Sequence, residues 1–170
     1  HPFGKEIVTV KGDFGGRELT LEYGRFGFFS NMVRAQIGDT VVMGIVTVNH
    51  KPADGLDFFP LTVEYEERFY ASGRISGSRF LKREGRPSDD AVIAGRLIDR
   101  PIRPLFPKGY RNETQAVALV LSLDPEVRSD IVGMIAVSTA LMISGSPFAG
   151  PVAGVRMGLD ENGGFIVNPT

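Results

Sequence analysis

Basic side chains are concentrated in one stretch of this sequence, which runs from Arg74 to Arg103. The stretch holds eight basic residues against four acidic ones, whereas the whole chain of 170 residues is nearly neutral, with 19 Lys and Arg against 20 Asp and Glu. The basic residues are Arg74, Arg79, Lys82, Arg83, Arg86, Arg96, Arg100 and Arg103. Seven of them are arginine, whose planar guanidinium group matches the oxygens of a phosphate. The pattern indicates local anion binding, and the alternative is a solvated charged surface.

The first half of the basic stretch is predicted to be a loop, because glycines stand at positions 73, 77 and 85. Phe80 and Leu81 lie inside this loop, directly before Lys82 and Arg83. A basic loop with an exposed aromatic ring suits single-stranded nucleic acid, because the cations follow the phosphate backbone while the ring stacks on a base. Together with Arg86, these four residues are the candidates for binding such a strand.

A helix is predicted to follow the loop. Ser88 is a favourable N-cap, and the two aspartates after it suit the positive end of the helix dipole. Ile93 and Leu97 are four residues apart and are expected to face a sheet. The same spacing gives the same expectation for Ala94 and Ile98.

Three arginines of this helix, Arg96, Arg100 and Arg103, are spaced to lie on one stripe. Pro101 lacks a backbone donor, so the helix is expected to kink or end near Arg100. The stripe has two interpretations that spacing leaves equally open. It supplies positive charge to an RNA or active site, or it forms salt bridges with neighbours such as Asp99.

Alternating or uniformly apolar runs predict strands elsewhere in the chain, at residues 5–10, 17–23, 31–37, 40–49, 61–66 and 115–123. The run 40–49 is apolar on both faces, which places it in the middle of a sheet. Residues 130–144 are apolar almost all round and predict a buried helix that stops at Gly145. Residues 152–159 and 165–167 predict a hairpin. The order of strands and helices is typical of one α/β domain.

Composition excludes several classes of function. The chain has no cysteine and only two histidines, so thiolate and multi-histidine metal sites are excluded. No phosphate-binding glycine motif of a kinase or nucleotide-binding fold is present, nor the motif of a serine hydrolase. The acidic face of strand 61–66, with Glu64 and Glu66, is expected to be solvated and has metal binding as its alternative. No apolar run of membrane-spanning length is present, and we expect a cytoplasmic protein.

Four blocks of the sequence resemble the bacterial polynucleotide phosphorylases, and within them the first of two ribonuclease-PH-like core domains. The blocks read DFFPLTVEYEERFYASGRISGS, REGRPSDDAVIAGRLIDRPIRPLFPKGY, DIVGMIAVSTALMISGSPFAGPVAGVRMG and FIVNPT. The resemblance covers nearly the whole chain, and LIDRPIRPLFP is its most specific part. It implies an α/β two-layer fold of the ribosomal-protein-S5-domain-2-like, ribonuclease-PH-like type, with a mixed sheet and helices packed on it.

The resemblance also implies a function. Members of the family degrade single-stranded RNA from its 3′ end, using inorganic phosphate as substrate to release nucleoside diphosphates, and they run in reverse as polymerases (polyribonucleotide nucleotidyltransferases). They require Mg²⁺, form ring-shaped homotrimers, and work in mRNA degradation with other proteins of the RNA-degradation machinery. We expect residues 1–170 to be the first core domain, truncated at its C-terminal end. The second core domain, which holds the family's metal and phosphate sites, and the KH and S1 domains are absent from this sequence.

Two departures from the family pattern concern the site. The family's RNA-constriction loop has two aromatics followed by two arginines, and Phe80-Leu81-Lys82-Arg83 stand at these positions here. Base stacking at Leu81 is expected to be weaker, because leucine has no π face. At the entry to the buried helix, where active relatives bind phosphate, Asp130 places a carboxylate that would repel an anion. We therefore expect no complete catalytic site in this chain, with Arg96, Arg100 and Arg103 as contributors to a site completed elsewhere.

Two other functions remain as alternatives. The chain alone would then be a non-catalytic module that binds RNA and forms oligomers. A small-molecule kinase of related fold class is the second alternative, but it requires a glycine-rich phosphate loop that this sequence lacks.

Overall fold

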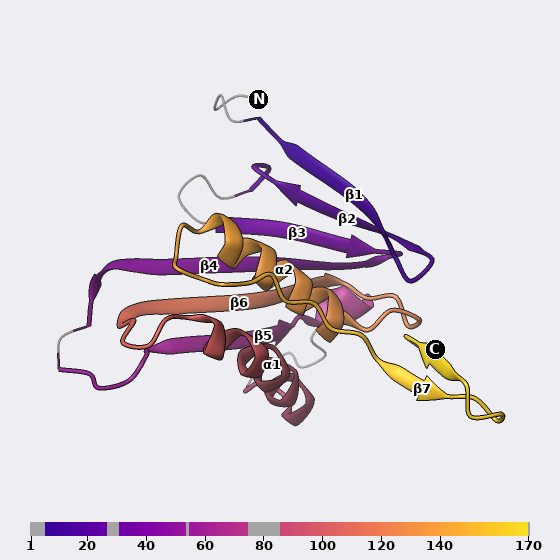
Figure 1. Ribbon diagram of the computed structural model, residues 1–170. Coiled ribbons are helices and arrows are strands. Elements are labelled where there is room, and N and C mark those ends of the chain that lie inside the picture. Colours follow the sequence, from indigo (N-terminus) through magenta and orange to yellow (C-terminus); the bar gives the residue numbers. More distant parts are fainter. Residues whose placement is uncertain (1–5, 27–30, 54, 75–85, 170) are drawn as a thin grey trace.

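The protein has two layers, with two helices on one face of a six-stranded sheet (Figure 1). The computed structural model describes residues 6–26, 31–53, 55–74 and 86–169. The strand order is β1-β2-β3-β4-β6-β5, and every neighbouring pair is antiparallel except β5 and β6, which are parallel. The strands are β1 (Val8–Phe14), β2 (Arg17–Tyr23), β3 (Asn31–Ile37), β4 (Thr40–Pro52), β5 (Leu61–Glu67) and β6 (Asn112–Ser122). The mixed sheet with helices packed on it confirms the predicted fold class.

The first strand of the first hairpin lies further along the chain than predicted. The strand expected at 5–10 is β1, which pairs with the whole of β2 from Val8 opposite Tyr23 to Phe14 opposite Arg17. Its turn is the pair Gly15 and Gly16, both with positive φ, at 63° and 84°. A two-residue turn of this kind matches the twist of the strands it joins, so the pairing continues up to the turn.

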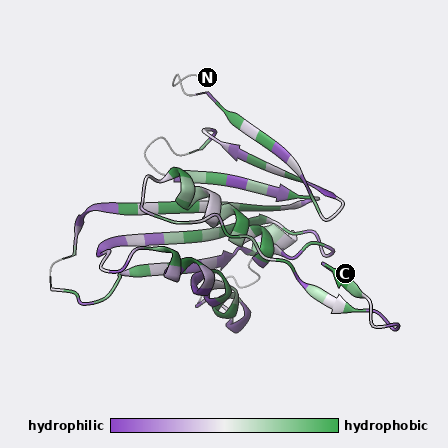
Figure 2. Ribbon diagram, in the orientation of Figure 1, coloured by the Kyte–Doolittle hydropathy of each residue, from purple (hydrophilic) through white to green (hydrophobic). Residues whose placement is uncertain are grey.

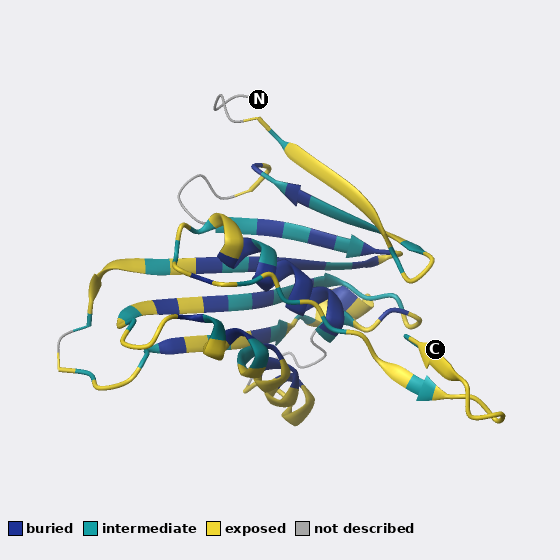
Figure 3. Cartoon of the chain, in the orientation of Figure 1, coloured by how far each residue is buried: buried dark blue, intermediate teal, exposed yellow. Residues whose placement is uncertain are grey.

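Helix α2 (Ser129–Ile143) lies across the centre of the sheet, on β4 and β3, and confirms the predicted buried helix. Figure 3 shows it buried along most of its length, and Figure 2 shows that it is hydrophobic nearly all round. Gly145 follows it with φ at 75°, as expected for a helix stop. The core between this helix and the sheet is formed by fully buried side chains that include Val42, Val46, Val120, Val132, Val137 and Leu141.

Helix α1 (Asp89–Ile102) packs on β5 beside α2, and Ser88 caps it by accepting a hydrogen bond from the Ala91 amide at 3.1 Å. The expectation that Ile93 and Leu97 face the sheet is wrong, because they are 63% and 47% exposed. Ala94 and Ile98 are buried as predicted. The buried face consists of Ala91, Ala94, Gly95, Ile98 and Ile102, and its small residues let the helix lie close to the strand.

The sequence predicted that Pro101 would kink or end the helix near Arg100, and α1 ends two residues after Arg100. The helix continues to Ile102 and leads into a short 3₁₀ turn, η2 (Arg103–Leu105). The carbonyl that loses its donor belongs to Leu97, four residues before Pro101. The Arg103 amide still bonds to the Asp99 carbonyl, so the last turn remains closed.

A second, smaller sheet is formed near the C-terminus by β7 (Met157–Leu159) and β8 (Phe165–Val167), a shorter first strand than the predicted 152–159. Figures 1 and 3 show this hairpin extending from the two-layer body and exposed over most of its surface. In the described residues, no helix is long and apolar enough to cross a membrane.

Replacing Gly44 with alanine is expected to destabilise the protein by about 3 kcal/mol, because the fold requires a glycine where β4 meets α2. A Cβ at Gly44 would lie 2.4 Å from the carbonyl carbon and oxygen of Ala136, so the helix backbone would have to move. Gly12→Ala on β1 is the control, since a Cβ there meets nothing within 4 Å. Urea unfolding of both variants measures the difference, and equal stabilities would contradict the close packing of α2 on β4.

Candidate nucleic-acid interface

A cavity of about 560 Å³ lies between the end of β5, the 3₁₀ turn η1 (Phe69–Ser72) and the start of α1. Three arginines line it: Arg68, Arg74 and Arg86. Phe69 also lines it, as do Pro87 and the N-cap Ser88, which lie at the positive end of α1. The cavity thus combines cations, a helix N-terminus and an aromatic ring.

The cations of this cavity are not equivalent. Arg68 forms an ion pair with Glu66, which lies on the same wall. Arg74 and Arg86 are exposed, and in the described part of the chain neither has an ion pair or a side-chain hydrogen bond. Glu66 pairs with Arg68 and Glu64 accepts a hydrogen bond from Gln115 at 3.3 Å, so the acidic face of β5 is engaged in protein contacts. Arg74 and Arg86 are therefore available to an anionic ligand.

The predicted constriction loop lies outside the described residues. Phe80, Leu81, Lys82 and Arg83 fall within residues 75–85, so their role stays a prediction. Arg86 is the one RNA-binding candidate that the structure describes, and it lines the cavity.

The three arginines of the α1 stripe do different things. Arg103 forms a salt bridge with Asp99 at 2.7 Å and donates to the backbone carbonyls of Leu61 (3.0 Å) and Phe59 (3.4 Å). Arg96 and Arg100 are exposed and make no such bond within the described ranges. The salt-bridge interpretation thus describes Arg103, while the guanidinium groups of Arg96 and Arg100 face solvent.

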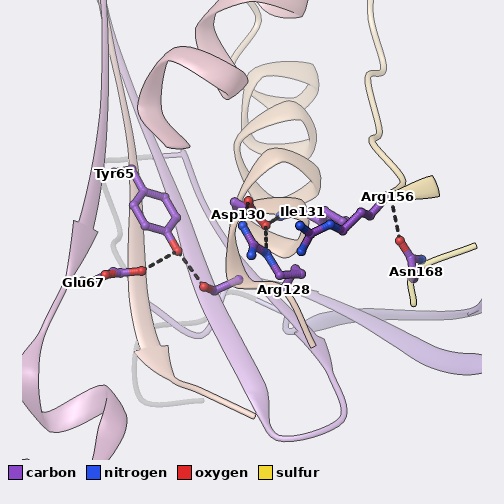
Figure 4. A network of polar contacts seen from close by, with 8 residues as sticks. Tyr65, Glu67, Arg128, Asp130, Ile131, Arg156 and Asn168 are labelled. Atoms are coloured by element: carbon purple, nitrogen blue, oxygen red, sulfur yellow. Dashed lines mark hydrogen bonds and ion pairs between the residues drawn. The ribbon is translucent and has the colours of Figure 1, made fainter. Parts of the chain in front are cut away.

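The start of α2 is occupied by the protein's own side chains (Figure 4). Asp130 accepts a hydrogen bond from the Ile131 amide at 2.9 Å and pairs with Arg128 at 2.8 Å. Next to it, the Tyr65 hydroxyl bonds to Ser129 Oγ at 2.7 Å and to Glu67 Oε1 at 3.3 Å. An anion at this helix end would meet the Asp130 carboxylate, as the sequence suggested.

Two groups at the start of α2 have a raised pKa. Burial raises the pKa of Tyr65 far above its ordinary value, and the negative charges of Glu67 and Asp130 add to the shift. The Asp130 carboxylate likewise raises the pKa of Arg128. The described residues contain no group of three or more carboxylates or histidines able to hold a metal ion.

Sequence patterns did not predict two features of this region: the exposed aromatic pair of η1 and the bond between Tyr65 and Ser129. It placed base stacking on Phe80 and overlooked Phe69 and Tyr70, which are 48% and 57% exposed. Two adjacent aromatics just before a glycine and an arginine were a usable signal for a surface site. The bond between Tyr65 and Ser129 joins residues 64 positions apart, and no local pattern indicates it.

The two-layer fold is shared with solved structures of low sequence identity. A rice (Oryza sativa) Rrp46 crystal structure aligns with a TM-score of 0.59 at 12% identity, over 99% of this chain and 73% of that one. The Archaeoglobus fulgidus exosome with RNA bound to the active site aligns with a TM-score of 0.55 at 16% identity, over 97% and 66%. At these identities the likeness defines a ribonuclease-PH-like fold.

The family model described as 3′ exoribonuclease family, domain 1 matches residues 15–147, and this chain belongs to that family. The polyribonucleotide nucleotidyltransferase of Desulfitobacterium hafniense is 52% identical over 169 residues, and that of Staphylococcus aureus is 52% identical over 167. Both alignments cover 98% of this chain but only 23% and 24% of the relatives. The resemblance to polynucleotide phosphorylases is confirmed, and the chain spans about a quarter of the length of these curated relatives.

Removing Arg103 is expected to cost stability, whereas removing Arg100 is not. Arg103→Ala takes away a partly exposed salt bridge and two bonds to backbone carbonyls, which together stabilise the fold by about 1–2 kcal/mol. Arg100→Ala is the matched control on the same helix and should change stability by no more than about 0.5 kcal/mol. Thermal and urea unfolding test this contrast, and an equal loss in both variants would show that Arg100 also has a structural role.

Proposed function

We propose that this chain is the first ribonuclease-PH-like core domain of a longer enzyme. The enzyme degrades single-stranded RNA from its 3′ end with inorganic phosphate, releases nucleoside diphosphates, and acts in mRNA degradation in the cytoplasm. The observation that carries the proposal is the 52% identity to polyribonucleotide nucleotidyltransferases over 98% of the chain. Identity this high over nearly every element extends beyond the shared fold.

Within that enzyme, this chain guides RNA and builds a homotrimer. Phe80, Lys82 and Arg83 contact the strand in the constriction loop, and Arg86 extends the contact into the cavity beside α1. Arg96 and Arg100 supply exposed charge toward an active site completed by another domain. The metal and the phosphate substrate are assigned to the second core domain, as the resemblance to the family implies.

A second candidate function applies to the chain by itself: a non-catalytic module that binds RNA and forms oligomers. The observation that favours it is the start of α2, where Asp130 and Arg128 occupy the helix end that would otherwise receive an anion. The two proposals are compatible if another domain of the enzyme carries out catalysis and this domain binds RNA.

The isolated 170-residue chain is expected to lack phosphorolysis, while the full-length enzyme has it. The reason is that the chain has Asp130 at the helix entry and no metal cluster among its described residues. Incubation of each with poly(A), phosphate and magnesium, followed by measurement of ADP, distinguishes them. Multiple turnovers by the isolated chain would overturn the assignment of the catalytic site to another domain.

The constriction loop is expected to hold RNA through charge. Replacing Lys82 and Arg83 together with alanine in the full-length enzyme should weaken binding, and each lost phosphate contact should reduce the log–log salt slope by about 0.7. Leu81→Phe should tighten binding with little change in slope, because stacking releases no counterions. RNA affinity across a salt series measures both effects. Wild-type affinity and slope in the double alanine variant would exclude this loop from the RNA path.

A further inference from the structure

We propose that the outer face of α1 binds the same face of a second copy of this chain, with the two helices antiparallel about a twofold axis. The outer face is formed by Asp90, Ile93, Leu97 and Arg100. This inference goes beyond the proposed function, since it concerns the association of two chains and no step of RNA degradation.

The outer face of α1 lies away from the side that packs on the sheet. A helix turns by about 100° per residue, so residues three, four and seven positions apart share one side. Ile93 and Leu97 are 63% and 47% exposed, whereas Ala94 and Ile98, next to them in sequence, are buried. Figure 3 shows α1 at the margin of the molecule with one side exposed. Two large apolar side chains on neighbouring turns of one exposed helix side form a surface suited to a protein contact.

The charges of the outer face are divided along the helix. Asp90 lies in the first turn and Arg100 in the last, and both are exposed. Neither forms an ion pair or a side-chain hydrogen bond within the described ranges. Asp89 and Arg96 flank the face and repeat the same division of charge. An RNA strand would be repelled at the aspartate end, whereas a second copy running in the opposite direction matches both ends.

One register satisfies the apolar and the charged residues together. A twofold axis level with Gly95 puts Ile93 opposite Leu97 of the second copy. The same axis puts Asp90 opposite Arg100 of the second copy, because both pairs are symmetric about position 95. Each contact occurs twice, so apolar side chains form the centre of the interface and an ion pair forms at each end. The spacing alternates three and four residues, as in helices that pack side by side.

The contact is small, and weak association is therefore expected. A single pair of helices buries less area than the interface of a stable complex. The chain should be monomeric in dilute solution and dimeric at high concentration, with a dissociation constant in the micromolar to millimolar range. Sedimentation equilibrium of the 170-residue chain from about 10 µM to about 1 mM measures it.

Charge reversal tests the two ends of the interface. Either Asp90→Arg or Arg100→Asp replaces both terminal ion pairs by like charges and should weaken dimerisation about 5- to 30-fold. The variant with both substitutions has opposite charges at each end again and should dimerise as the wild type does. Unfavourable contacts with the helix dipole occur in the single and the double variants alike, so they do not produce this pattern.

Removing the apolar centre tests the middle of the interface. Ile93→Ala combined with Leu97→Ala should weaken dimerisation at least about tenfold, because the loss occurs on both copies. Val92→Ala is the matched control. Val92 is an apolar residue of the same helix and is 43% exposed, but it lies about 100° around the helix from Ile93. This variant should dimerise as the wild type does.

A chain that stays monomeric up to about 1 mM would overturn the contact. So would single charge reversals without effect, or a double reversal that fails to restore dimerisation. A trimer that is insensitive to all of these variants would also overturn it, and would support the proposed homotrimer instead. Because release of nucleoside diphosphates is measured separately, the contact and the proposed reaction can fail independently.

Discussion

The close approach of α2 to β4 is the constraint on which the rest of the structure depends. A helix backbone can lie directly on a strand only where the strand has no side chain, and Gly44 provides that position opposite Ala136. Gly133, one turn earlier on α2, brings the helix against Ala118 of β6, Tyr65 of β5 and Ile98 of α1. Both helices and the neighbouring strands β5 and β6 thus meet around one small residue. Since interiors are close-packed, a shift of α2 would displace all of them.

The same packing determines where the candidate interface lies. Thr40, fully buried at the start of β4, accepts a hydrogen bond from the Asp124 amide at 2.8 Å and donates to the Val127 carbonyl at 3.2 Å. The segment leading into α2 is therefore fixed to the sheet, and Ser129 reaches Tyr65 near the end of β5. Strand β5 continues through Arg68 into η1. The cavity wall is thereby connected, through short hydrogen bonds, to the most buried part of the protein.

The sequence predicted the strands well because, on a sheet with one covered face, alternating apolar and polar residues determine which side chains face the core. The prediction of the buried face of α1 failed in part. The helix has two apolar pairs, each with a spacing of four residues, and the two pairs lie on different faces. The bulkier pair, Ile93 and Leu97, suggested the wrong one. Close contact with β5 selects the face of small residues around Ala94, and this depends on tertiary packing that a single helix does not encode. The position of Phe69 likewise depends on a turn without periodicity.

The fold divides the arginines of the basic stretch into groups that make different contacts. Arg103 holds the end of α1 to the start of β5, and Arg68, just outside the stretch, is paired with Glu66. Arg96 and Arg100 face solvent along α1, while Arg74 and Arg86 flank the cavity at its opposite end. Arg74, Arg86, Arg96 and Arg100 thus have no ion pair in the described residues, so their charge is available to an anion. The fold therefore separates structural arginines from exposed ones, a division that charge counting in the sequence does not contain.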